Sequence, residues 1–228
     1  MLGGPGRHQS WLIASFALLL FGAPRSASAT FIGVDDGRLL EASCTTFNPP
    51  NYCGDPVSAT PSAPFAPFDL RVASAVGQAS QNSSISPNQL SGTLRVLMGD
   101  LSSMRQASAH SLFSITFDVD VATPFSLTGS GIGGNNFNRI NSLSLAQGTT
   151  SIFSVAISSS FGEPFATSGE LTPGRYTLRA ELLEYLPTYQ ELDFQLQAVP
   201  EPRTALCFGA GLALLGLGAR WRRGFARC

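Results

Sequence analysis

The amino-acid sequence predicts an all-β fold, an antiparallel β-sandwich of jelly-roll or immunoglobulin-like type. Two observations predict it. Apolar and polar residues alternate with a period of two in several short segments, which gives each predicted strand one apolar face. Clusters of Gly, Pro, Asn and Ser separate these segments, and no long stretch between residues 30 and 198 has helical periodicity. An uncharged apolar run flanks this central region near each end of the chain.

Residues 1–29 have the pattern of a secretory signal peptide. A short segment with a basic residue precedes the apolar run at 11–21, and the small-residue site Ala27-Ser28-Ala29 follows it. We expect signal peptidase to cleave before Thr30. The alternative is an uncleaved membrane anchor, and in either case the region that follows, residues 30–198, is exported.

The opening strands are predicted around a turn. Alternation at Ile32 and Val34, followed by Leu39-Leu40, indicates a hairpin with its turn at Asp35-Asp36-Gly37, because Asp-Gly favours tight turns. Residues 42–68 contain six prolines among Ser, Ala and Thr, so we expect a loop followed by a loose arm.

The next segments combine short strands with polar stretches. Residues 70–72 and 94–98 have the apolar alternation of strands, whereas residues 78–88 are polar and predict an exposed loop. Residues 100–110 predict a loop or a short helix.

The longest alternation begins at Phe113 and continues to Val121, with Ser, Thr and Asp on the opposite face. Pro124 interrupts it, and the alternation resumes at Phe125 and Leu127. Sixteen phenylalanines supply the expected core, because aromatic side chains bury large areas. The same alternation predicts three further strands, which include residues 153–157, 176–182 and 192–196.

Two of the four cysteines, Cys44 and Cys53, fall in the exported region and are predicted to form a disulfide. Closing this turn-rich loop would stabilise the fold by roughly 2.5–3 kcal/mol if the effect is entropic. Metal binding is the alternative, but the neighbouring sequence offers no further ligands. Cys207 and Cys228 have no obvious partner.

The predicted domain at 30–198 is acidic. It contains seven arginines against fourteen acidic residues, a net charge of −7, and no lysine. Nucleic acids and anionic lipids are bound by basic surfaces, so this charge argues against both as partners.

The C-terminal segment 199–228 has three parts in a fixed order. Val199-Pro200-Glu201-Pro202 comes first, the uncharged apolar run 204–219 follows, and Arg220-Trp221-Arg222-Arg223 ends it. As a helix the run would reach about 24 Å, close to the thickness of a bilayer hydrocarbon core. We therefore predict a transmembrane helix at 204–219 with the arginines on the cytoplasmic side. A buried C-terminal core helix is the alternative.

This segment resembles the PEP-CTERM sorting domain, the signal carried by exosortase substrates of Gram-negative bacteria. The resemblance covers only about residues 199–227 and rests on the Pro-Glu-Pro core, the apolar run and the arginine cluster in that order. It implies recognition by an exosortase, a membrane-embedded cysteine protease, with cleavage near Pro200, Glu201 and Pro202. It also implies an inner-membrane intermediate, followed by delivery to the cell surface or the extracellular polysaccharide matrix. The tail after the arginines, which ends at Cys228, is slightly longer than usual.

We predict no catalytic site. His110 is the single histidine of the exported region, and on a Ser-rich segment we interpret it as an exposed bystander. No Gly-x-Ser-x-Gly motif is present. Glu181 and Glu184 are candidates for the paired carboxylates of a glycoside hydrolase, but a spacing of three on a strand puts them on opposite faces.

Binding motifs are equally sparse. Residues 129–134 match G-x-G-x-x-G, but no helical pattern follows to hold a pyrophosphate, so we expect an inter-strand loop. Asp118 and Asp120 on one strand, and Asp35 and Asp36 in a turn, are candidate calcium ligands that we interpret as solvated surface residues. We predict no metal site and no cofactor.

Three functions are compatible with these observations. The leading one is a non-enzymatic cell-surface or matrix protein, sorted by an exosortase and associated with exopolysaccharide or biofilm. The second is a carbohydrate-binding module, with a secreted hydrolase that uses carboxylates as the third. The candidate aromatic platforms of a carbohydrate-binding module are Tyr52, Tyr176, Tyr185 and Tyr189.

Overall fold

The computed structural model describes residues 30–46, 55–99, 105–133, 140–157 and 162–199. These residues belong to one compact unit. The predicted signal peptide, Cys53 and the segment after Val199 lie outside the described residues. Within the described part, no helix has the length and apolar character needed to cross a membrane.

The described residues form β-strands and short connections. The thirteen strands are β1 (Phe31–Asp36), β2 (Leu39–Thr46), β3 (Val57–Ala59), β4 (Phe68–Ala73), β5 (Gly77–Ser86), β6 (Gln89–Met98), β7 (Arg105–Val119), β8 (Thr123–Ile132), β9 (Ile140–Gln147), β10 (Thr150–Ala156), β11 (Glu163–Leu171), β12 (Gly174–Glu184) and β13 (Thr188–Ala198).

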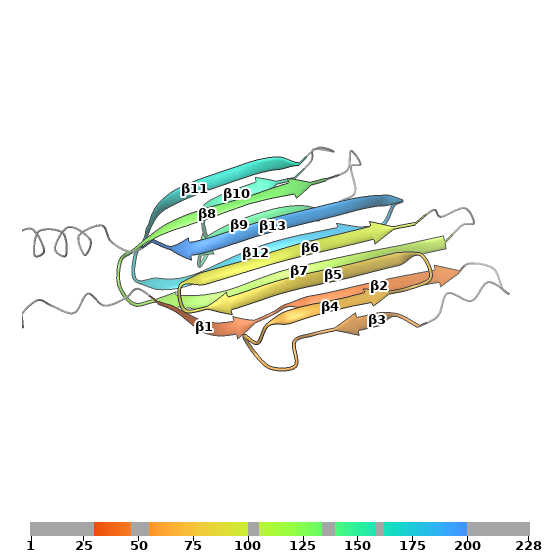
Figure 1. Ribbon diagram of the computed structural model, residues 1–228, viewed down its shortest axis with the longest axis horizontal. Helices are drawn as coiled ribbons and strands as arrows, with labels where there is room; N and C mark the ends of the chain where they lie inside the picture. The colour runs from red at the N-terminus through yellow and green to blue at the C-terminus, as the bar shows by residue number, and fades with distance from the viewer. Residues whose placement is uncertain (1–29, 47–54, 100–104, 134–139, 158–161, 200–228) are drawn as a thin grey trace, which may run out of the picture. The chain divides into compact units, whose positions relative to one another are not determined.

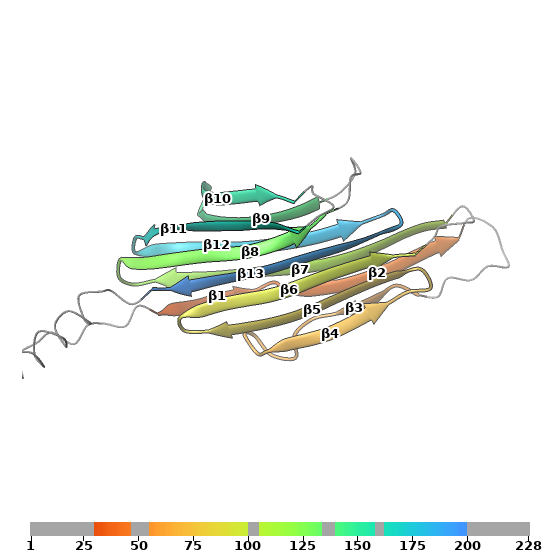
Figure 2. The ribbon, with the colours of Figure 1, turned by 45° about the horizontal axis from the view of Figure 1, so that its top comes forward.

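The strands form two antiparallel sheets. Sheet A has the order β10-β9-β12-β7-β2-β3, with β1 also paired to β7. Sheet B has the order β11-β8-β13-β6-β5-β4 and lies in front of sheet A in Figure 1 (turned in Figure 2). The predicted all-β, antiparallel, two-sheet arrangement is therefore confirmed.

The facing sides of the two sheets share one apolar core. The ring of Phe113 on β7 lies 4.8 Å, centroid to centroid, from that of Phe194 on β13, so this pair joins the sheets. On the sheet A side, the ring of Phe31 lies 4.9 Å from that of Phe117. Every phenylalanine in the described residues is buried or packed against this core, as predicted: Phe31, Phe65, Phe68, Phe113, Phe117, Phe125, Phe153, Phe165 and Phe194.

The core also holds a buried charge. The side chain of Arg38, between β1 and β2, is fully buried, and its Nε and Nη2 donate to the Asp36 carboxylate at 2.9 and 2.6 Å. Its Nη1 donates to Ser83 Oγ on β5 at 3.1 Å, and Nη2 also donates to the carbonyl of Ala66 at 2.7 Å. The guanidinium carbon lies 5.6 Å from the centre of the Phe68 ring. One side chain thus connects sheet A, sheet B and the segment that leads into β4.

The Asp36 carboxylate is held from a second direction. It accepts the backbone N–H of Phe65 at 2.7 Å, and Phe65 has a left-handed φ of 61°. Burial raises the pKa of Asp36, but the hydrogen bonds from Arg38 and Phe65 outweigh it, so this pKa lies below its ordinary value. The carboxylate is therefore ionised at neutral pH and neutralises Arg38 inside the core.

The predicted opening hairpin is wrong. β1 and β2 both run antiparallel to β7, one after the other, and the N–H of Gly37 donates to the carbonyl of Ser114 between them. The Asp-Gly signal therefore marks an interruption of the strand rather than a reversal. The reason is that Asp36 uses its carboxylate to bind Arg38, which turns into the core at this point.

The predicted loop at 78–88 is also wrong, because Gly77–Ser86 forms β5. Its buried positions Gln81 and Ser83 are polar, and Gln81 Nε2 donates to Ser83 Oγ at 3.0 Å. Ser83 in turn accepts from Arg38. The inward face of β5 is polar at these positions because Ser83 binds the buried Arg38 and Gln81 binds Ser83. Apolar alternation could therefore not reveal this strand.

Two smaller predictions are also wrong. Residues 105–110 belong to β7, where small Ala107 and Ala109 face the core and give only a weak hydropathy contrast. Residues 57–59 form the short edge strand β3 within the region predicted as a loose arm.

Replacing Asp36 with Ala would leave the guanidinium of Arg38 buried without a counter-charge. We expect the free energy of unfolding in urea to fall by about 3–5 kcal/mol. The matched control is Asp118→Ala, which removes a carboxylate from the exposed pair with Arg175 and should leave the urea midpoint unchanged. Equal midpoints for the two variants would contradict the structural role assigned to the buried pair.

The buried pair also predicts a pH dependence. Because the pKa of Asp36 is lower in the folded chain, its stabilising contribution is complete above the ordinary value of 3.8 and is lost as the pH falls through the folded-state value. Stability should therefore decline on acidification below roughly pH 5, and Asp36→Asn should flatten this decline. Urea unfolding at stepwise pH measures both profiles, and parallel profiles would exclude Asp36 as a source of the acid sensitivity.

Candidate functional site

The outer face of sheet B is a nearly continuous polar surface. Alternation within β5, β6, β13 and β8 turns one set of side chains toward the core and the other set outward. The strand register places Asn82, Thr93, Asp193 and Ser130 in one row across these four strands. The neighbouring row contains Ser84, Ser91, Gln195 and Thr128.

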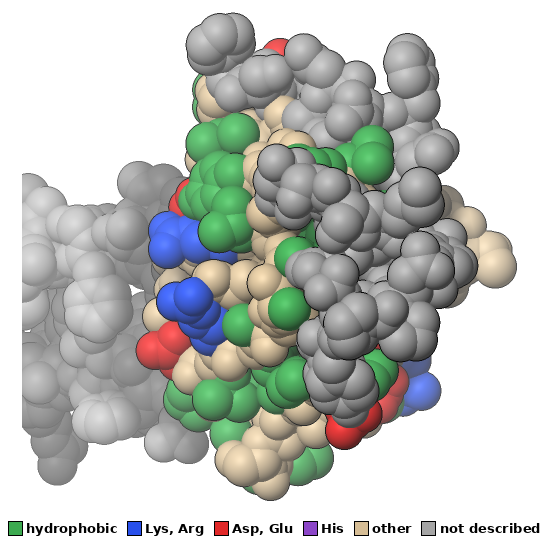
Figure 3. All heavy atoms as spheres, turned by 90° about the vertical axis from the view of Figure 1, so that its right-hand side faces the viewer, with side chains coloured by type: hydrophobic (Ala, Val, Ile, Leu, Met, Phe, Trp, Pro, Cys, Tyr) green, Lys and Arg blue, Asp and Glu red, His purple; other side chains and the backbone are tan. Residues whose placement is uncertain are grey.

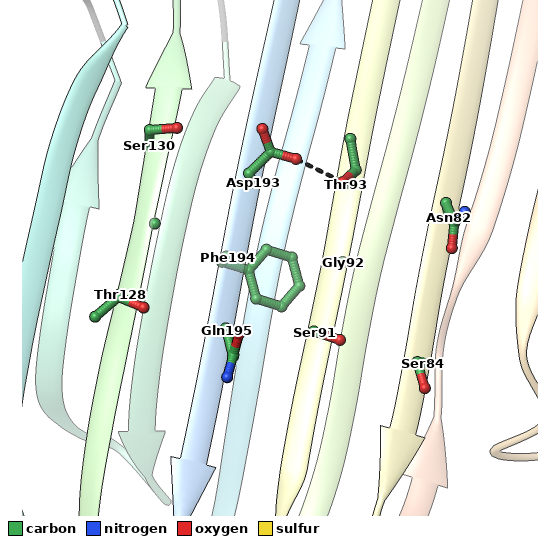
Figure 4. Close-up of a pocket in the computed structure, with 11 residues that line it drawn as sticks. Asn82, Ser84, Ser91, Gly92, Thr93, Thr128, Ser130, Asp193, Phe194 and Gln195 are labelled. Atoms are coloured by element: carbon green, nitrogen blue, oxygen red, sulfur yellow. Dashed lines mark hydrogen bonds between the residues drawn. The ribbon is translucent and has the colours of Figure 1, made fainter.

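These two rows line a depression of about 480 Å³, which we call the sheet B hollow. Its lining consists of hydroxyl, amide and carboxylate side chains together with Gly92, Gly129 and Phe194. Figure 4 shows the lining residues on four neighbouring strands, with Asp193 turned toward Thr93. The hollow therefore offers many hydrogen-bonding groups and exposes more polar than apolar surface.

Asp193 is the one ionisable group in this lining. Thr93 Oγ1 donates to its Oδ1 at 2.5 Å, which fixes the orientation of the carboxylate. Among the described residues, Asp193 Oδ2 has no hydrogen-bond partner. The carboxylate therefore keeps capacity to accept hydrogen bonds from a ligand.

A ridge of three side chains, Tyr189, Glu191 and Arg95, lies beside the hollow on the same face. Glu191 accepts from Arg95 Nη2 at 2.8 Å and from the Tyr189 hydroxyl. Burial raises the pKa of Tyr189 to about 12, together with its hydrogen bond to Glu191. Burial also raises the pKa of Glu191, but the hydrogen bonds from Arg95 and Tyr189 outweigh it and lower this pKa below its ordinary value. The ridge thus combines a neutral tyrosine with a compensated ion pair.

The aromatic ring of this ridge is accessible. Tyr189 is 42% exposed, and its cross-strand neighbour Leu97 is 45% exposed. Together they place an apolar surface at the end of the polar face.

Gly129 and Gly131 lie inside β8, so the predicted inter-strand loop is wrong for residues 129–132, and Gly134 lies outside the described residues. A Cβ on Gly129 would lie 2.2 Å from the carbonyl oxygen of Asp193 and 2.3 Å from the ring of Phe165. A Cβ on Gly131 would lie 2.5 Å from Ile157. These glycines allow neighbouring side chains and backbone to approach β8 closely, which accounts for the glycine spacing without a phosphate-binding role.

His110 lies on the outer face of sheet A in a row of charged groups. Its Nε2 is 3.0 Å from Glu181 Oε1 and its Nδ1 is 3.5 Å from Glu41 Oε2. Arg179 donates to Glu181 from Nε at 3.1 Å and from Nη2 at 2.7 Å. The interpretation of His110 as an exposed bystander is therefore wrong. Within the described residues no hydroxyl or thiol is hydrogen-bonded to this imidazole, as a Ser-His-acid site would require.

Glu181 and Glu184 lie on opposite faces of β12, as predicted. Glu184 is fully buried and accepts the backbone N–H groups of Tyr185 at 2.9 Å and Leu186 at 2.8 Å. It also accepts from the amide of Gln190. This carboxylate therefore orders the turn between β12 and β13 and does not pair with Glu181.

The candidate calcium ligands are dispersed. Asp118 accepts from Arg175 at 2.8 and 3.0 Å, and Asp36 is the buried partner of Arg38. Asp35 and Asp120 are exposed. In the part of the chain that the structure describes, no group of three or more His, Cys, Asp or Glu is placed to hold a metal ion.

The tyrosine candidates divide into two kinds. Tyr176 is 1% exposed, and its hydroxyl donates to the carbonyl of Thr172 at 2.7 Å, so the prediction of a surface platform is wrong for this residue. Tyr185 and Tyr189 are exposed. Tyr52 lies outside the described residues.

Cys44 is a buried, disulfide-bonded cysteine on β2. Its predicted partner Cys53 lies outside the described residues, and the pairing of these two residues stays a prediction.

The first and last described strands share one end of the sandwich. The N–H of Phe31 donates to the carbonyl of Pro87, and the N–H of Ala198 donates to the carbonyl of Asn88 in the same turn. The N–H of Val199 donates to the carbonyl of Pro124 at 2.8 Å. Figure 1 shows the start of β1 and the end of β13 at this end.

The opposite end carries the turn between β12 and β13. Tyr185 and Leu186 are exposed there. Figure 3 views this end and shows apolar side chains in separate groups among arginines and polar atoms.

Sequence reasoning identified Tyr189 but missed the residues of the sheet B hollow. Asn82 and Ser84 lie in the segment 78–88 that the sequence predicts as a loop, and Thr93 and Asp193 are ordinary polar residues beside or within predicted strands. Their one common feature is that each is an outward-facing polar residue of its strand. This feature locates a site only once the pairing of β5, β6 and β13 is known.

Comparisons with known proteins give little similarity. No protein-family model matches the sequence. No curated protein matches it either. Among solved structures, the chain is similar to the native structure of a family 35 carbohydrate binding module from Clostridium thermocellum. The TM-score is 0.25 and the sequence identity 10%, over 76% of this chain and 100% of that chain. Similarity at this level carries no argument about the function of this chain.

The close packing around β8 generates a prediction. Gly129→Ala would place a methyl group against the Asp193 carbonyl and the Phe165 ring, and we expect it to destabilise the fold by about 1–3 kcal/mol. The control is Gly37→Ala, whose Cβ would make only an ordinary 3.5 Å contact with Ser114. Thermal denaturation followed by circular dichroism compares the two, and a Gly129→Ala midpoint at or above that of the control would contradict this packing.

Proposed function

We propose that this chain is an exported, non-catalytic protein of the cell surface or extracellular matrix, sorted by an exosortase and associated with exopolysaccharide. One observation carries the proposal. The Pro-Glu-Pro motif at 200–202, followed by the apolar run and the arginine cluster, begins directly where the last strand of the folded domain ends.

The position of this junction suits proteolytic release. β13 lies between β8 and β6 in sheet B and ends at Ala198, and Val199 is still bonded to the Pro124 carbonyl. Cleavage near Pro200, Glu201 and Pro202 would therefore leave all thirteen described strands intact.

The same junction sets the distance to the membrane. Only residues 200–203 separate the end of the folded domain from the apolar run at 204–219. Before cleavage, the end of the sandwich that carries Phe31 and Ala198 would be held close to the membrane surface.

The absence of catalysis is part of the proposal. The His110, Glu181 and Arg179 group is a hydrogen-bonded row on a strand face, and within the described residues no nucleophile is bonded to the imidazole. Glu181 and Glu184 face opposite sides of β12, so these two carboxylates do not form the pair that glycoside hydrolysis uses.

Replacing Pro200, Glu201 and Pro202 together by Ala tests the sorting step. In a host with an active exosortase, the unaltered protein should be recovered without the residues that follow the motif, whereas the triple variant should keep its tail to Cys228. Intact-mass measurement with N- and C-terminal sequencing distinguishes the two products. It also reports whether cleavage occurs before Thr30.

The matched control is Thr93→Val, a change within the folded domain that should be processed as efficiently as the unaltered protein. Recovery of the unaltered protein with its tail intact in cells that contain the exosortase would contradict the proposed sorting.

A further inference from the structure

We propose that the outer face of sheet B binds a segment of a neutral carbohydrate chain, with its polar contacts in the sheet B hollow and the ring of Tyr189 as a stacking surface. This inference rests on the proposed function for the origin of the glycan, since an exported matrix protein meets exopolysaccharide. It goes beyond that proposal in naming the site and the chemical class of the ligand.

The chemistry of the hollow suits sugar hydroxyls. Each sugar hydroxyl both donates and accepts, so it is best met by groups that offer both functions close together. Asn82 and Gln195 each present an amide with a donor and an acceptor, and Asp193 presents an acceptor that Thr93 holds in place. Hydroxyl groups fill the remaining positions, at Ser84, Ser91, Thr128 and Ser130.

The charge of the face favours a neutral ligand. Asp193 is the single charged group in the hollow, and Arg95, on the neighbouring ridge, is paired with Glu191. A polyanionic chain would meet the Asp193 carboxylate and no cation among the residues that line the hollow, since the nearby Arg95 already bonds Glu191 and is attracted by Asp193. The net charge of −7 over residues 30–198 also repels a polyanionic ligand.

The dimensions favour a chain over a single sugar. The hollow crosses four strands, which at about 4.8 Å between neighbours spans roughly 14 Å. Tyr189 lies on the same face of β13 four residues before Asp193, about 14 Å along the strand. Contacts at Tyr189 and at Asp193 therefore require a ligand that extends over more than one sugar unit.

The ring of Tyr189 is exposed and its orientation is fixed, as stacking against a sugar ring requires. Its ring is 42% exposed, while its hydroxyl is held by Glu191, which is in turn held by Arg95. A side chain fixed in this way loses little conformational freedom when a ligand packs against it. Leu97 lies opposite Tyr189 in the register and widens the apolar surface.

A protein partner fits this face less well. Protein interfaces are centred on desolvated apolar or aromatic anchors. In the hollow the centre is polar, and the exposed apolar residues Tyr189 and Leu97 lie to one side of it.

Affinity electrophoresis of the protein purified from its host tests the inference. The gels contain one of three neutral polysaccharides (hydroxyethyl cellulose, xylan or galactomannan), the host's own exopolysaccharide, or alginate as a polyanion. We expect retardation by the host exopolysaccharide or a neutral polysaccharide. Asp193→Ala and Tyr189→Ala should each weaken it, by roughly 10- to 100-fold for Asp193→Ala, as expected for loss of hydrogen bonds to a charged group.

The control is Asp118→Ala, which removes the same charge from the outer face of sheet A and should bind as the unaltered protein does. Circular dichroism of each variant confirms that the fold is retained, and Thr93→Val, which removes only the hydroxyl that orients Asp193, gives a second and milder probe. Each variant should keep its thermal midpoint within a few degrees of the unaltered protein.

Three results would overturn the inference: no retardation in any gel, retardation by alginate alone, or retardation that Asp193→Ala and Tyr189→Ala leave unchanged. The mass of each preparation reports sorting independently. A protein that keeps its tail but binds a glycan refutes only the sorting proposal, and a processed protein that binds none refutes only this inference.

Discussion

The buried ion pair of Arg38 and Asp36 is the constraint on which the rest of the sandwich depends. A guanidinium within an apolar core is tolerated only when it is paired and hydrogen-bonded, and here each of its three nitrogens donates to Asp36, Ser83 or Ala66. These partners come from sheet A, from sheet B and from the segment that leads into β4. The pair therefore accounts for the interruption between β1 and β2, for the left-handed backbone at Phe65 and for the polar inner face of β5.

β5 connects this interior constraint to the outer surface. On its inward face, Ser83 accepts a hydrogen bond from Arg38 and Gln81 donates one to Ser83. The alternate residues Asn82 and Ser84 face outward, so this part of the strand is polar on both sides. Through the register with β6, β13 and β8, its outward residues join the row that includes Asp193. The face that we propose for carbohydrate binding is thus positioned by the pairing that brings Ser83 to the buried arginine.

Large apolar residues that alternate with polar ones predicted the strands that carry most of the core, as at Phe113 in β7 and Leu178 in β12. The pattern failed where inward residues are polar or small, as at Gln81 in β5 and Ala109 in β7. The contact of Thr93 with Asp193 spans 100 positions and exists only through the pairing of β6 with β13, so no local pattern contains it. The resemblance of segment 199–228 to a sorting signal, by contrast, lies in a linear order of residues that the sequence displays without any fold.

The central claim is that an exported sandwich presents the outer face of sheet B to a glycan. The most direct test is to record backbone amide chemical shifts of the isotopically labelled protein during titration with oligosaccharides prepared from the host exopolysaccharide. The largest changes should occur at Thr93, Ser130 and Asp193, with a further group around Tyr189. Changes confined to β7 and β12, or none at the highest oligosaccharide concentration, would contradict the claim.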